Sequence, residues 1–407
     1  MTEPIHDFTA KLRQPSLRGH LESYVRWRRA RSRARAGGGP EPQPPDLAPI
    51  SINLDLTTAC NYRCDHCIDW DLLNAKHSHD DSKLRESIRT LVERGLRSVI
   101  LIGGGEPTLY PGFADFVGFL KHQKLQLAVV SNGSRCDRLF EIAPLLEERD
   151  WIRLSLDAGS DRLFRAMHRP ASRSLSLDEI CRWVPRIARR GRGCQIGYSY
   201  IIVWAGAARG DVEIRDNVCE IAMATERARR HRFDYIAFKP VLERAPDGAE
   251  IMDPARAREG LESAVRRIRR ELERARALAT DSFQVRESIN LRALEDGSWR
   301  EFARQPRTCH MQALRQVLTP TGLYNCPAHR GVERARIAGR DAYAGAAAAA
   351  RTGRRLGELM ERFDASRECR EVTCLYNRVN WWLEKMIEDP RADTGSEVDA
   401  ERLDAFL

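Results

Sequence analysis

The sequence lacks any run of about 18 apolar residues, the length that a membrane-spanning helix requires. Its first ten residues, MTEPIHDFTA, include acidic side chains and lack the apolar segment of a secretory signal. We therefore expect a globular protein with no membrane segment, located in the cytoplasm. Its eleven cysteines are an odd number, and thiols in a reducing compartment more often bind metal or lie in the core than form disulfides.

The composition sets the size and the charge of the molecule. The chain has 407 residues, 42% of them hydrophobic, which is enough for a substantial core in two or three domains or in one extended barrel. The net charge of +9 comes largely from arginine, and the densest basic stretch is YVRWRRARSRARAGGG. Such a stretch can contact nucleic acid. Because arginines elsewhere alternate with acidic residues, we interpret the charge as a bias of the whole chain and do not expect a nucleic-acid partner.

The chain divides into segments of different character. Residues 1–49 are predicted to be a basic arm followed by a Gly/Pro-rich linker. Residues 50–242 contain six short apolar runs separated by helical patterns, at 50–56, 98–104, 126–132, 151–157, 195–203 and 235–241. Alternation of this kind predicts an α/β fold with a parallel sheet. Since six units are too few for an eightfold barrel, we expect a partial (β/α)6 TIM-like barrel that is open on one side.

The remaining residues predict a smaller α+β extension. Residues 243–300 are expected to form a helical connector with a long charged helix at about 254–279. Residues 301–385 contain LRQVLTPTGLYNC, in which a Pro-Thr-Gly turn between apolar runs predicts a β-hairpin. Residues 386–407 read as an acidic tail.

Three cysteines lie within eight positions in TTACNYRCDHCIDW: Cys60, Cys64 and Cys67. Structural zinc normally takes four protein ligands, and His66 lies too close between two of the thiols to reach the same ion easily. A cubane [4Fe-4S] cluster held by three thiolates leaves one iron without a protein ligand. That iron can bind a chelating small molecule which completes its coordination and accepts an electron.

The spacing C-x3-C-x2-C resembles the cluster motif of the radical S-adenosylmethionine (SAM) superfamily. GGGEP at residues 103–107 resembles the segment of that family that receives the methionine amino group of SAM, and His66 occupies a position near its adenine. The resemblance implies a [4Fe-4S] cluster, SAM, and an external one-electron donor such as flavodoxin or ferredoxin. It assigns cofactor contacts to His66, Gly104, Gly105, Glu106, Pro107, Ser131, Asn132, Ser155 and Asp157.

The residues themselves agree with this resemblance. Active sites of barrels lie at the carboxyl ends of the strands, where Cys60, Glu106, Asn132 and Asp157 are expected. The glycines before Glu106 allow the backbone to approach a ligand, and the Glu106 carboxylate suits an ammonium group.

A second set of cysteines follows the predicted barrel: Cys309, Cys326, Cys369 and Cys374. Four thiolates suit either a closed [4Fe-4S] cluster or a zinc site, and spacing alone does not separate the two. The arrangement resembles the SPASM/twitch extensions of radical SAM enzymes, which implies one auxiliary [4Fe-4S] cluster. The remaining cysteines lie in apolar surroundings and are predicted to be core thiols: Cys136, Cys181, Cys194 and Cys219.

Together these features predict a radical SAM oxidoreductase that acts on a polar small molecule, such as a sugar, aminocyclitol or nucleoside intermediate of natural-product biosynthesis. The auxiliary cluster would accept or relay an electron. No residue announces itself as the catalytic acid or base, and weak candidates for substrate contact are Tyr198, Tyr200, Trp204 and Lys239. Two alternatives remain: a radical SAM maturase that modifies a peptide, and a zinc-stabilised nucleic-acid-binding protein.

Overall fold

A computed structural model describes residues 8–191, 193–389, 391–392 and 406. The chain folds into two compact units. The first includes Leu54–Ser78 and Val99–Trp299, and the second comprises Asp7–Asn53, His79–Ser98 and Arg300–Leu407. The second unit is therefore assembled from three separate parts of the sequence.

The first unit is built on a parallel sheet. Its strands follow the order β11-β8-β5-β4-β3-β2, and the pairs β11–β8, β8–β5, β5–β4 and β4–β3 are parallel. The strand bounds are β2 Ser98–Leu101, β3 Gln126–Ser131, β4 Trp151–Ser155, β5 Gln195–Ile202, β8 Tyr235–Pro240 and β11 Gln284–Glu287. Most of their residues are buried, as expected for apolar strands covered on both faces.

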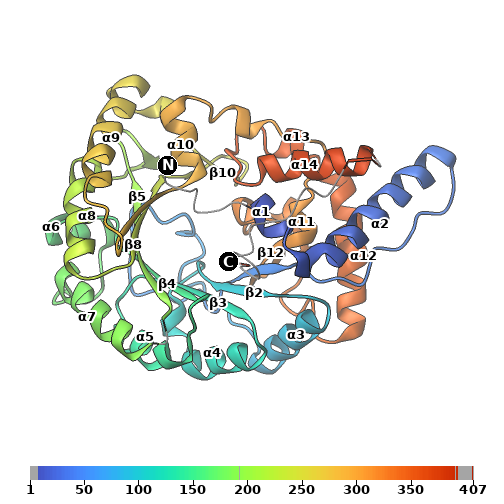
Figure 1. Ribbon diagram of the computed structural model, residues 1–407, viewed down its shortest axis with the longest axis horizontal. Helices are drawn as coiled ribbons and strands as arrows, with labels where there is room; N and C mark the ends of the chain where they lie inside the picture. The colour runs from blue at the N-terminus through green and yellow to red at the C-terminus, as the bar shows by residue number, and fades with distance from the viewer. Residues whose placement is uncertain (1–7, 192, 390, 393–405, 407) are drawn as a thin grey trace. The chain divides into compact units, whose positions relative to one another are not determined.

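Helices cover the outer side of this sheet (Figure 1). They are α4 Phe113–His122, α5 Cys136–Ile142, α6 Asp161–His168, α7 Leu177–Arg190, α8 Ile221–Arg230, α9 Leu261–Arg276 and α10 Ile289–Asp296, with the short 3-10 helices η2 Pro107–Leu109, η3 Ala143–Leu145, η4 Val218–Glu220 and η5 Pro254–Arg256. Two short hairpins complete the unit, β6 Ala208–Arg209 with β7 Val212–Glu213, and β9 Glu243–Arg244 with β10 Glu250–Ile251.

Local sequence explains these helices. In α7, the Ser176 side chain caps the first turn by accepting a hydrogen bond from the Glu179 backbone, and Ile180, Val184 and Ile187 form the buried stripe. The predicted α/β class with a partial barrel is confirmed.

The second unit combines helices with strands that are neighbours in the order β1-β12-β13-β14. Its strands are β1 Ser51–Leu54, β12 Arg315–Thr319, β13 Gly322–Tyr324 and β14 Arg336–Ala338, and its helices are α1 Phe8–Leu12, α2 Arg18–Gly37, α3 Asp81–Glu93, α11 Met311–Leu314, α12 Ala346–Arg362, α13 Ala365–Glu368 and α14 Asn377–Glu388, with η1 Pro15–Leu17, η6 Glu301–Ala303, η7 Pro327–His329 and η8 Glu333–Ala335. The antiparallel pairing of β12 with β13 confirms the predicted hairpin.

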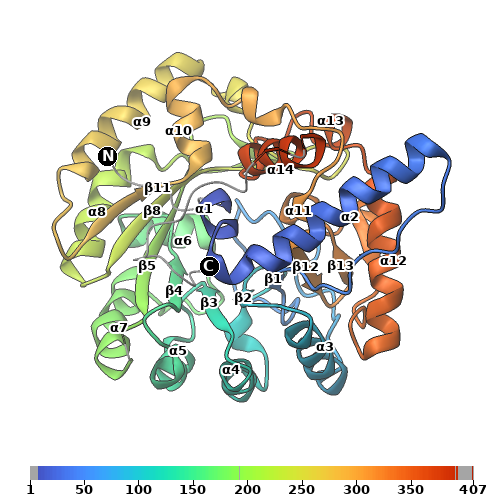
Figure 2. The same cartoon turned by 45° about the vertical axis from the view of Figure 1, so that its right-hand side comes forward.

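The prediction of a basic arm is wrong for residues 18–37, which form α2. Leu21, Tyr24, Val25 and Trp27 of this helix are buried, and α2 lies beside α12 and α14 (Figure 2). The Arg29 guanidinium donates to the carbonyl oxygen of Asp389 at 3.0 Å. The basic stretch is therefore part of a packed helix, whose apolar face the sequence analysis overlooked.

The prediction of a helical connector over 243–300 is wrong in part, because the segment contains strands as well as α9 and α10. Strand β11 lies inside this segment and extends the sheet of the first unit. The sequence analysis missed this strand because its residues are largely polar. Glu287 is nevertheless buried, in an ion pair with Arg276 in which Nε and Oε1 are 2.6 Å apart. The long charged helix predicted there is α9, shorter than expected.

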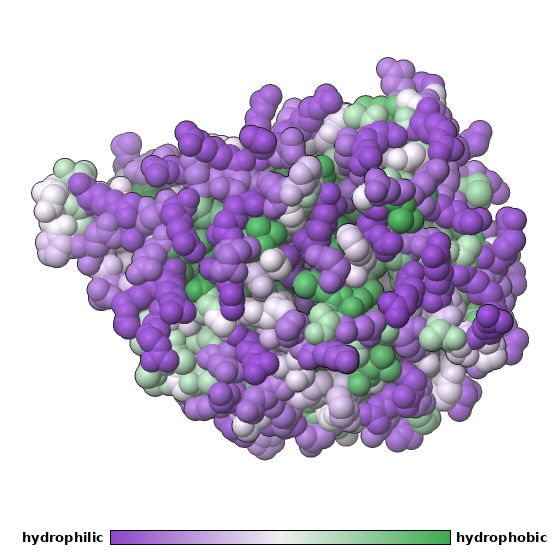
Figure 3. All heavy atoms as spheres, turned by 180° about the vertical axis from the view of Figure 1, so that it is seen from behind, coloured by the Kyte–Doolittle hydropathy of each residue, from purple (hydrophilic) through white to green (hydrophobic). Residues whose placement is uncertain are grey.

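Smaller differences concern the surface. Cys136, Cys181 and Cys194 are buried, whereas Cys219 is exposed, so its assignment to the core is wrong. Of the predicted acidic tail, residues 390, 393–405 and 407 lie outside the described part of the chain. Figure 3 shows a face on which hydrophilic residues predominate. Among the described residues, no helix combines the length and the apolar composition that crossing a bilayer requires.

Candidate metal and cofactor sites

The three clustered thiols lie on a loop that begins after β1 and belongs to the first unit. Neighbouring backbone holds this loop in place: the Asp65 amide donates to the carbonyl of Met167 at 2.9 Å, and the Arg63 amide donates to that of His168 at 3.1 Å. A side chain also contributes, since the Arg209 guanidinium donates to the Cys64 carbonyl at 2.9 Å. The end of α6 and the β6–β7 hairpin therefore fix the loop.

The thiols of the loop influence one another electrostatically. Burial raises the pKa of Cys64 well above its usual value, and the charges of Cys67 and Cys60 raise it further. Burial and the charge of Asp69 raise the pKa of Cys67 to about 12. Three thiolates gathered in such surroundings are unfavourable unless a cation neutralises them, because buried charges need a partner. The loop is thus suited to a metal centre.

His168, which the sequence analysis missed, contacts the central thiol of the loop. Its Nδ1 lies 3.2 Å from Cys64 Sγ, and its Nε2 lies 2.9 Å from the carbonyl oxygen of Leu156. Since a carbonyl only accepts, Nε2 carries the proton, and burial lowers the His168 pKa to about 4 so that the ring stays neutral. In the metal-free chain, the Cys64 thiol therefore donates to Nδ1.

Asp157 organises the polar residues next to this loop. Its backbone has a φ of 49°, which is uncommon for a residue other than glycine. Its carboxylate accepts from the Ile201 amide at 2.6 Å and from His66 Nε2 at 3.0 Å. Burial alone would raise the Asp157 pKa, but the hydrogen bonds that the carboxylate accepts, first that from His66, bring it below its usual value. His66 Nδ1 is buried and has no hydrogen-bond partner among the described atoms.

The Glu106 carboxylate accepts four hydrogen bonds within the protein. Its Oε1 accepts from the Thr108 hydroxyl at 2.6 Å, from the Thr108 amide at 3.1 Å and from the Ser131 hydroxyl at 2.8 Å, while Oε2 accepts from the Asn132 amide at 2.7 Å. Burial raises the Glu106 pKa, and these donors partly oppose that rise. The predicted residues Glu106, Ser131 and Asn132 thus come together, with Pro107 opening the helical turn η2 beside them.

The two glycines before Glu106 allow the chain to approach itself closely. A Cβ atom at Gly105 would lie 2.5 Å from the carbonyl oxygen of Ala59, and one at Gly104, where φ is +62°, would lie 2.7 Å from Asp55 Oδ2. Both contacts are too short for a real side chain. These glycines therefore press the GGGEP segment against the start of the thiol loop, where the Glu106 amide donates to Ala59 at 2.8 Å.

The four candidates for substrate contact differ in what their polar atoms do. The Tyr198 hydroxyl donates to the Ala158 carbonyl and the Tyr200 hydroxyl donates to that of Asn217, so both are engaged in the fold. Trp204 is 1% exposed, and its indole N–H is buried without a hydrogen-bond partner among the described atoms. Lys239 and Ser155 are half-buried at the ends of β8 and β4.

The second set of thiols comes together within the second unit. Burial raises the pKa of Cys369 well above its usual value. The nearby charges of Cys309, Cys374 and Cys326 raise it further. Nitrogen donors face three of these sulfurs: Asn380 Nδ2 at 3.6 Å from Cys309, the Tyr376 amide at 3.3 Å from Cys374, and His329 Nε2 at 3.5 Å from Cys369. The sequence analysis missed His329, although it lies only three residues after Cys326.

One group of possible metal ligands in the described residues is compact enough to surround a single ion. Thiolates around one zinc at a Zn–S distance of about 2.3 Å lie about 3.8 Å apart in a tetrahedron. Among the described residues, the one group of three possible ligands with all atoms within 4.8 Å is Cys64, His66 and His168. Neither set of cysteines is that compact. A cubane cluster distributes its thiolates over different irons and does not require them to lie this close together.

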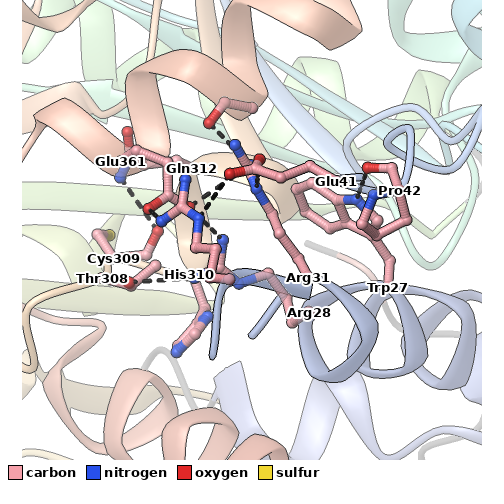
Figure 4. A network of polar contacts seen from close by, with 12 residues as sticks. Trp27, Arg28, Arg31, Glu41, Pro42, Thr308, Cys309, His310, Gln312 and Glu361 are labelled. Atoms are coloured by element: carbon pink, nitrogen blue, oxygen red, sulfur yellow. Dashed lines mark hydrogen bonds and ion pairs between the residues drawn. The ribbon is translucent and has the colours of Figure 1, made fainter. Parts of the chain in front are cut away.

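A polar network surrounds Cys309 (Figure 4). Glu361 accepts from Arg28 of α2 at 3.1 Å, and the same guanidinium donates to the Thr308 hydroxyl at 3.2 Å. Behind these residues, the Tyr24 hydroxyl lies 2.7 Å from His310 Nδ1. Helix α2 thus supports the segment that carries the first thiol of the second set.

Residues 54–205 match the model of the radical SAM superfamily. The chain carries a radical SAM domain. Members of this superfamily bind a [4Fe-4S] cluster and SAM, which confirms the predicted pair of cofactors; the auxiliary cluster stays a prediction.

Relatives of known name match parts of this radical SAM protein. An S-adenosylmethionine-dependent nucleotide dehydratase of Thermoplasmatales archaeon (strain ISO4-H5) is 36% identical over 108 residues, which is 26% of this chain and 38% of that protein. The chain therefore spans well under half of that relative.

Solved structures show the same fold at low sequence identity. Native anSMEcpe with bound AdoMet has a TM-score of 0.54 at 13% identity, over 82% of this chain and 88% of that chain. Streptococcus suis SuiB bound to the precursor peptide SuiA has a TM-score of 0.50 at 14% identity, over 72% of this chain and 62% of that chain.

Proposed function

We propose that the protein is a radical SAM oxidoreductase that removes two electrons from a polar small molecule, such as a sugar, aminocyclitol or nucleoside intermediate of natural-product biosynthesis. The observation that carries this proposal is the second set of converging thiols, Cys309, Cys326, Cys369 and Cys374, in a chain that also has a radical SAM domain. A second metal centre beyond the one that SAM needs points to electron transfer in addition to hydrogen abstraction.

Cys60, Cys64 and Cys67 would hold the first cluster. When bound, this cluster and SAM supply a 5′-deoxyadenosyl radical that abstracts a hydrogen atom from carbon. The protein residues would position SAM. When the His66 ring is neutral and Nε2 donates to Asp157, its buried Nδ1 is an acceptor and would suit a hydroxyl or amino donor of the adenosine part.

Glu106 has a shaping role in this proposal. Its carboxylate already accepts four hydrogen bonds, so it holds the GGGEP segment to Ser131 and Asn132 and keeps negative charge near the place where the methionine ammonium would lie. Gly104, Gly105 and Pro107 set the backbone of the same segment, and Ser155 would line it at the end of β4.

The oxidation balances with two losses from the substrate. A hydrogen atom leaves with the deoxyadenosyl group, and the resulting substrate radical loses one electron and one proton. The auxiliary cluster would supply the electron acceptor, solvent or a side chain would take the proton, and an external donor such as flavodoxin or ferredoxin would deliver the electron that cleaves SAM.

Trp204 is the side chain best suited to meet the substrate. Burial of an indole N–H without an acceptor costs roughly 1–3 kcal/mol, and a hydroxyl or carbonyl oxygen of the substrate would remove that cost. Tyr198 and Tyr200, whose hydroxyls bond to the main chain, are better interpreted as framework residues.

A peptide substrate is the second candidate. SuiB, whose fold is similar, is bound to a precursor peptide, whereas the relative with the higher sequence identity is named a nucleotide dehydratase. We favour the small molecule because the nucleotide dehydratase, at 36% identity over 108 residues, is more similar to this chain in sequence than SuiB, at 14%. The third alternative, a zinc-stabilised nucleic-acid-binding protein, gains no support from the radical SAM match.

The test is the content of iron and sulfide after anaerobic reconstitution. We expect about eight irons per chain in the wild type, about four in Cys60→Ala/Cys64→Ala/Cys67→Ala and about four in Cys309→Ala/Cys326→Ala/Cys369→Ala/Cys374→Ala. Cys219→Ala, which removes an exposed thiol outside both sets, is the control and should retain all eight. A wild type with about four irons, none of them lost with the second set, would remove the basis for an oxidoreductase.

Turnover tests the first half of the proposal. Reduced wild-type enzyme should convert SAM to 5′-deoxyadenosine, and Cys64→Ala should abolish this conversion. If Cys64→Ala still cleaves SAM, the assignment of the thiol loop is wrong. Candidate nucleosides, aminocyclitols and peptides can then be compared by the stimulation of SAM cleavage that each produces.

A further inference from the structure

His329 occupies a defined place beside the second set of thiols. Cys326 is the N-cap residue of the 3-10 turn η7, and His329 is the last residue of that turn. The His329 amide donates to the Cys326 carbonyl at 3.2 Å. The imidazole therefore lies within one turn of the residue that carries the Cys326 thiol, and the charge of Cys326 is near enough to Cys369 to raise the pKa of that thiol.

Packing fixes the orientation of the imidazole. His329 is fully buried, and its ring meets the Phe363 ring edge-on, with 5.2 Å between centroids and 81° between planes. On the other side, Nε2 lies 3.5 Å from Cys369 Sγ. An ion pair between Arg334 and Glu368 anchors the helix that leads into Cys369. Neither partner of the contact is free to turn away.

The chemistry of the contact follows from the state of the thiol. A thiol that binds metal is deprotonated, and a thiolate only accepts hydrogen bonds. A ring nitrogen at 3.5 Å from it must therefore carry its proton. A hydrogen bond to a cluster sulfur stabilises the reduced and more negative form, which raises the reduction potential.

We propose that His329 donates its Nε2–H to the Cys369 thiolate and raises the reduction potential of the auxiliary cluster, which adapts that cluster to accept an electron. This inference rests on the auxiliary cluster of the proposed function. Four thiolates already complete that cluster, so His329 is a positioning residue that acts through Cys369. Asn380, which donates a hydrogen bond to Cys309, has a different role from His329. Its side-chain oxygen also accepts from the amides of His310 and Met311, so this residue serves the fold.

The experiment compares His329→Leu and His329→Gln in the full chain, with Cys60, Cys64 and Cys67 changed to Ala so that only the auxiliary cluster contributes. Potentials are measured by redox titration followed by electron paramagnetic resonance. His329→Leu should keep about four irons and titrate at a more negative potential. His329→Gln, which can still donate an N–H, should lie between His329→Leu and the parent.

Each other outcome overturns the proposal in a recognisable way. An unchanged potential in His329→Leu would mean that no hydrogen bond acts on the cluster. Loss of iron from His329→Leu would make His329 a ligand. Zinc, or no metal, in the parent would instead disprove the auxiliary cluster itself. If His329→Leu does not fold, pulsed resonance on the parent labelled with 15N-histidine decides: a weak nitrogen coupling supports the hydrogen bond, and a strong coupling or none contradicts it.

Discussion

At Glu106, two hydroxyl groups and two backbone amides converge on one buried carboxylate, which joins the residues after β2 to the end of β3. Three of these donors reach Oε1 and one reaches Oε2. An amide at this position would present an NH2 group to at least one of those donors, and a donor facing a donor leaves both unsatisfied.

We expect Glu106→Gln to lower the free energy of unfolding by about 1–3 kcal/mol, the cost of leaving buried polar groups unpaired. Urea unfolding of the metal-free protein measures this. Glu148→Gln, a change of the same chemistry at an exposed position, should stay within about 0.5 kcal/mol of the wild type. Equal effects of the two substitutions would show that the Glu106 network contributes nothing specific to stability.

Single residues show what the sequence could and could not reveal. Cys60, Cys64 and Cys67 were recognisable because their ligand spacing is local. His168 contacts Cys64 across 104 positions, and nothing in its neighbourhood indicates that α6 ends at the thiol loop. His329 could have been noticed, since a histidine three residues after a candidate ligand is a local pattern, but the direction of its side chain depends on the turn η7.

Helix α2 shows the same limit at the level of an element. The positions Leu17, Leu21, Tyr24 and Val25 follow the i, i+4, i+7, i+8 pattern of a buried helical stripe, and all four are buried. Arginine dominates the rest of the segment and masked this pattern. The arginines are themselves used in the fold, as the contacts of Arg28 with Glu361 and of Arg29 with Asp389 show.

We expect Trp27→Ala in α2 to cost about 3–5 kcal/mol, because it leaves a cavity and removes the hydrogen bond from the indole to the Pro42 carbonyl at 3.2 Å. Reconstituted Trp27→Ala should also lose iron from the second thiol set first. Arg33→Ala, at an exposed position of the same helix, is the matched control and should be neutral. A Trp27→Ala protein as stable as Arg33→Ala would mean that α2 is dispensable. Deleting the helix would not test nucleic-acid binding, since it removes part of the core.

The apolar strands were easier to predict than the polar strand β11 or the division of the chain into two units. All six apolar runs became strands because parallel strands buried on both faces are continuously apolar. Strand β11 escaped because its charged residue Glu287 is buried with an arginine partner, a compensation that only the tertiary structure reveals. The division into units escaped as well, because α3 lies between two strands in sequence yet belongs to the second unit.

At the scale of the whole molecule, both units contain a histidine that the fold keeps neutral. Burial, followed by the charge of Arg97, lowers the pKa of His20 in the second unit to about 4, and burial lowers that of His168 in the first unit to about 4. The unfolded chain takes up these protons near pH 6.5. Between pH 6.5 and 4 the unfolded state therefore binds more protons, and stability falls as the pH falls.

For metal-free protein we expect the free energy of unfolding to drop by roughly 2 kcal/mol per histidine between pH 7 and pH 5, less for His20 because part of its ring remains accessible. Urea unfolding at several pH values measures the slope. His20→Gln should have a shallower slope than the wild type, whereas His122→Gln, at the end of α4, should keep it. An identical slope in His20→Gln and wild type would exclude His20 as a source of the acid sensitivity.

The second unit is built from three distant parts of the chain, which has a consequence for synthesis in the cell. Helix α2 leaves the ribosome early, but α14, against which it packs, follows about 350 residues later. At about 5–20 residues per second, this is a delay of roughly 20–70 s. During that time the apolar face of α2, which includes Leu21, Tyr24 and Val25, lacks its contact with α14 and is exposed to non-native association. The cysteines from Cys309 to Cys374 emerge near the end of the same interval, so any metal held by this set would be inserted only after most of the second unit has been synthesised.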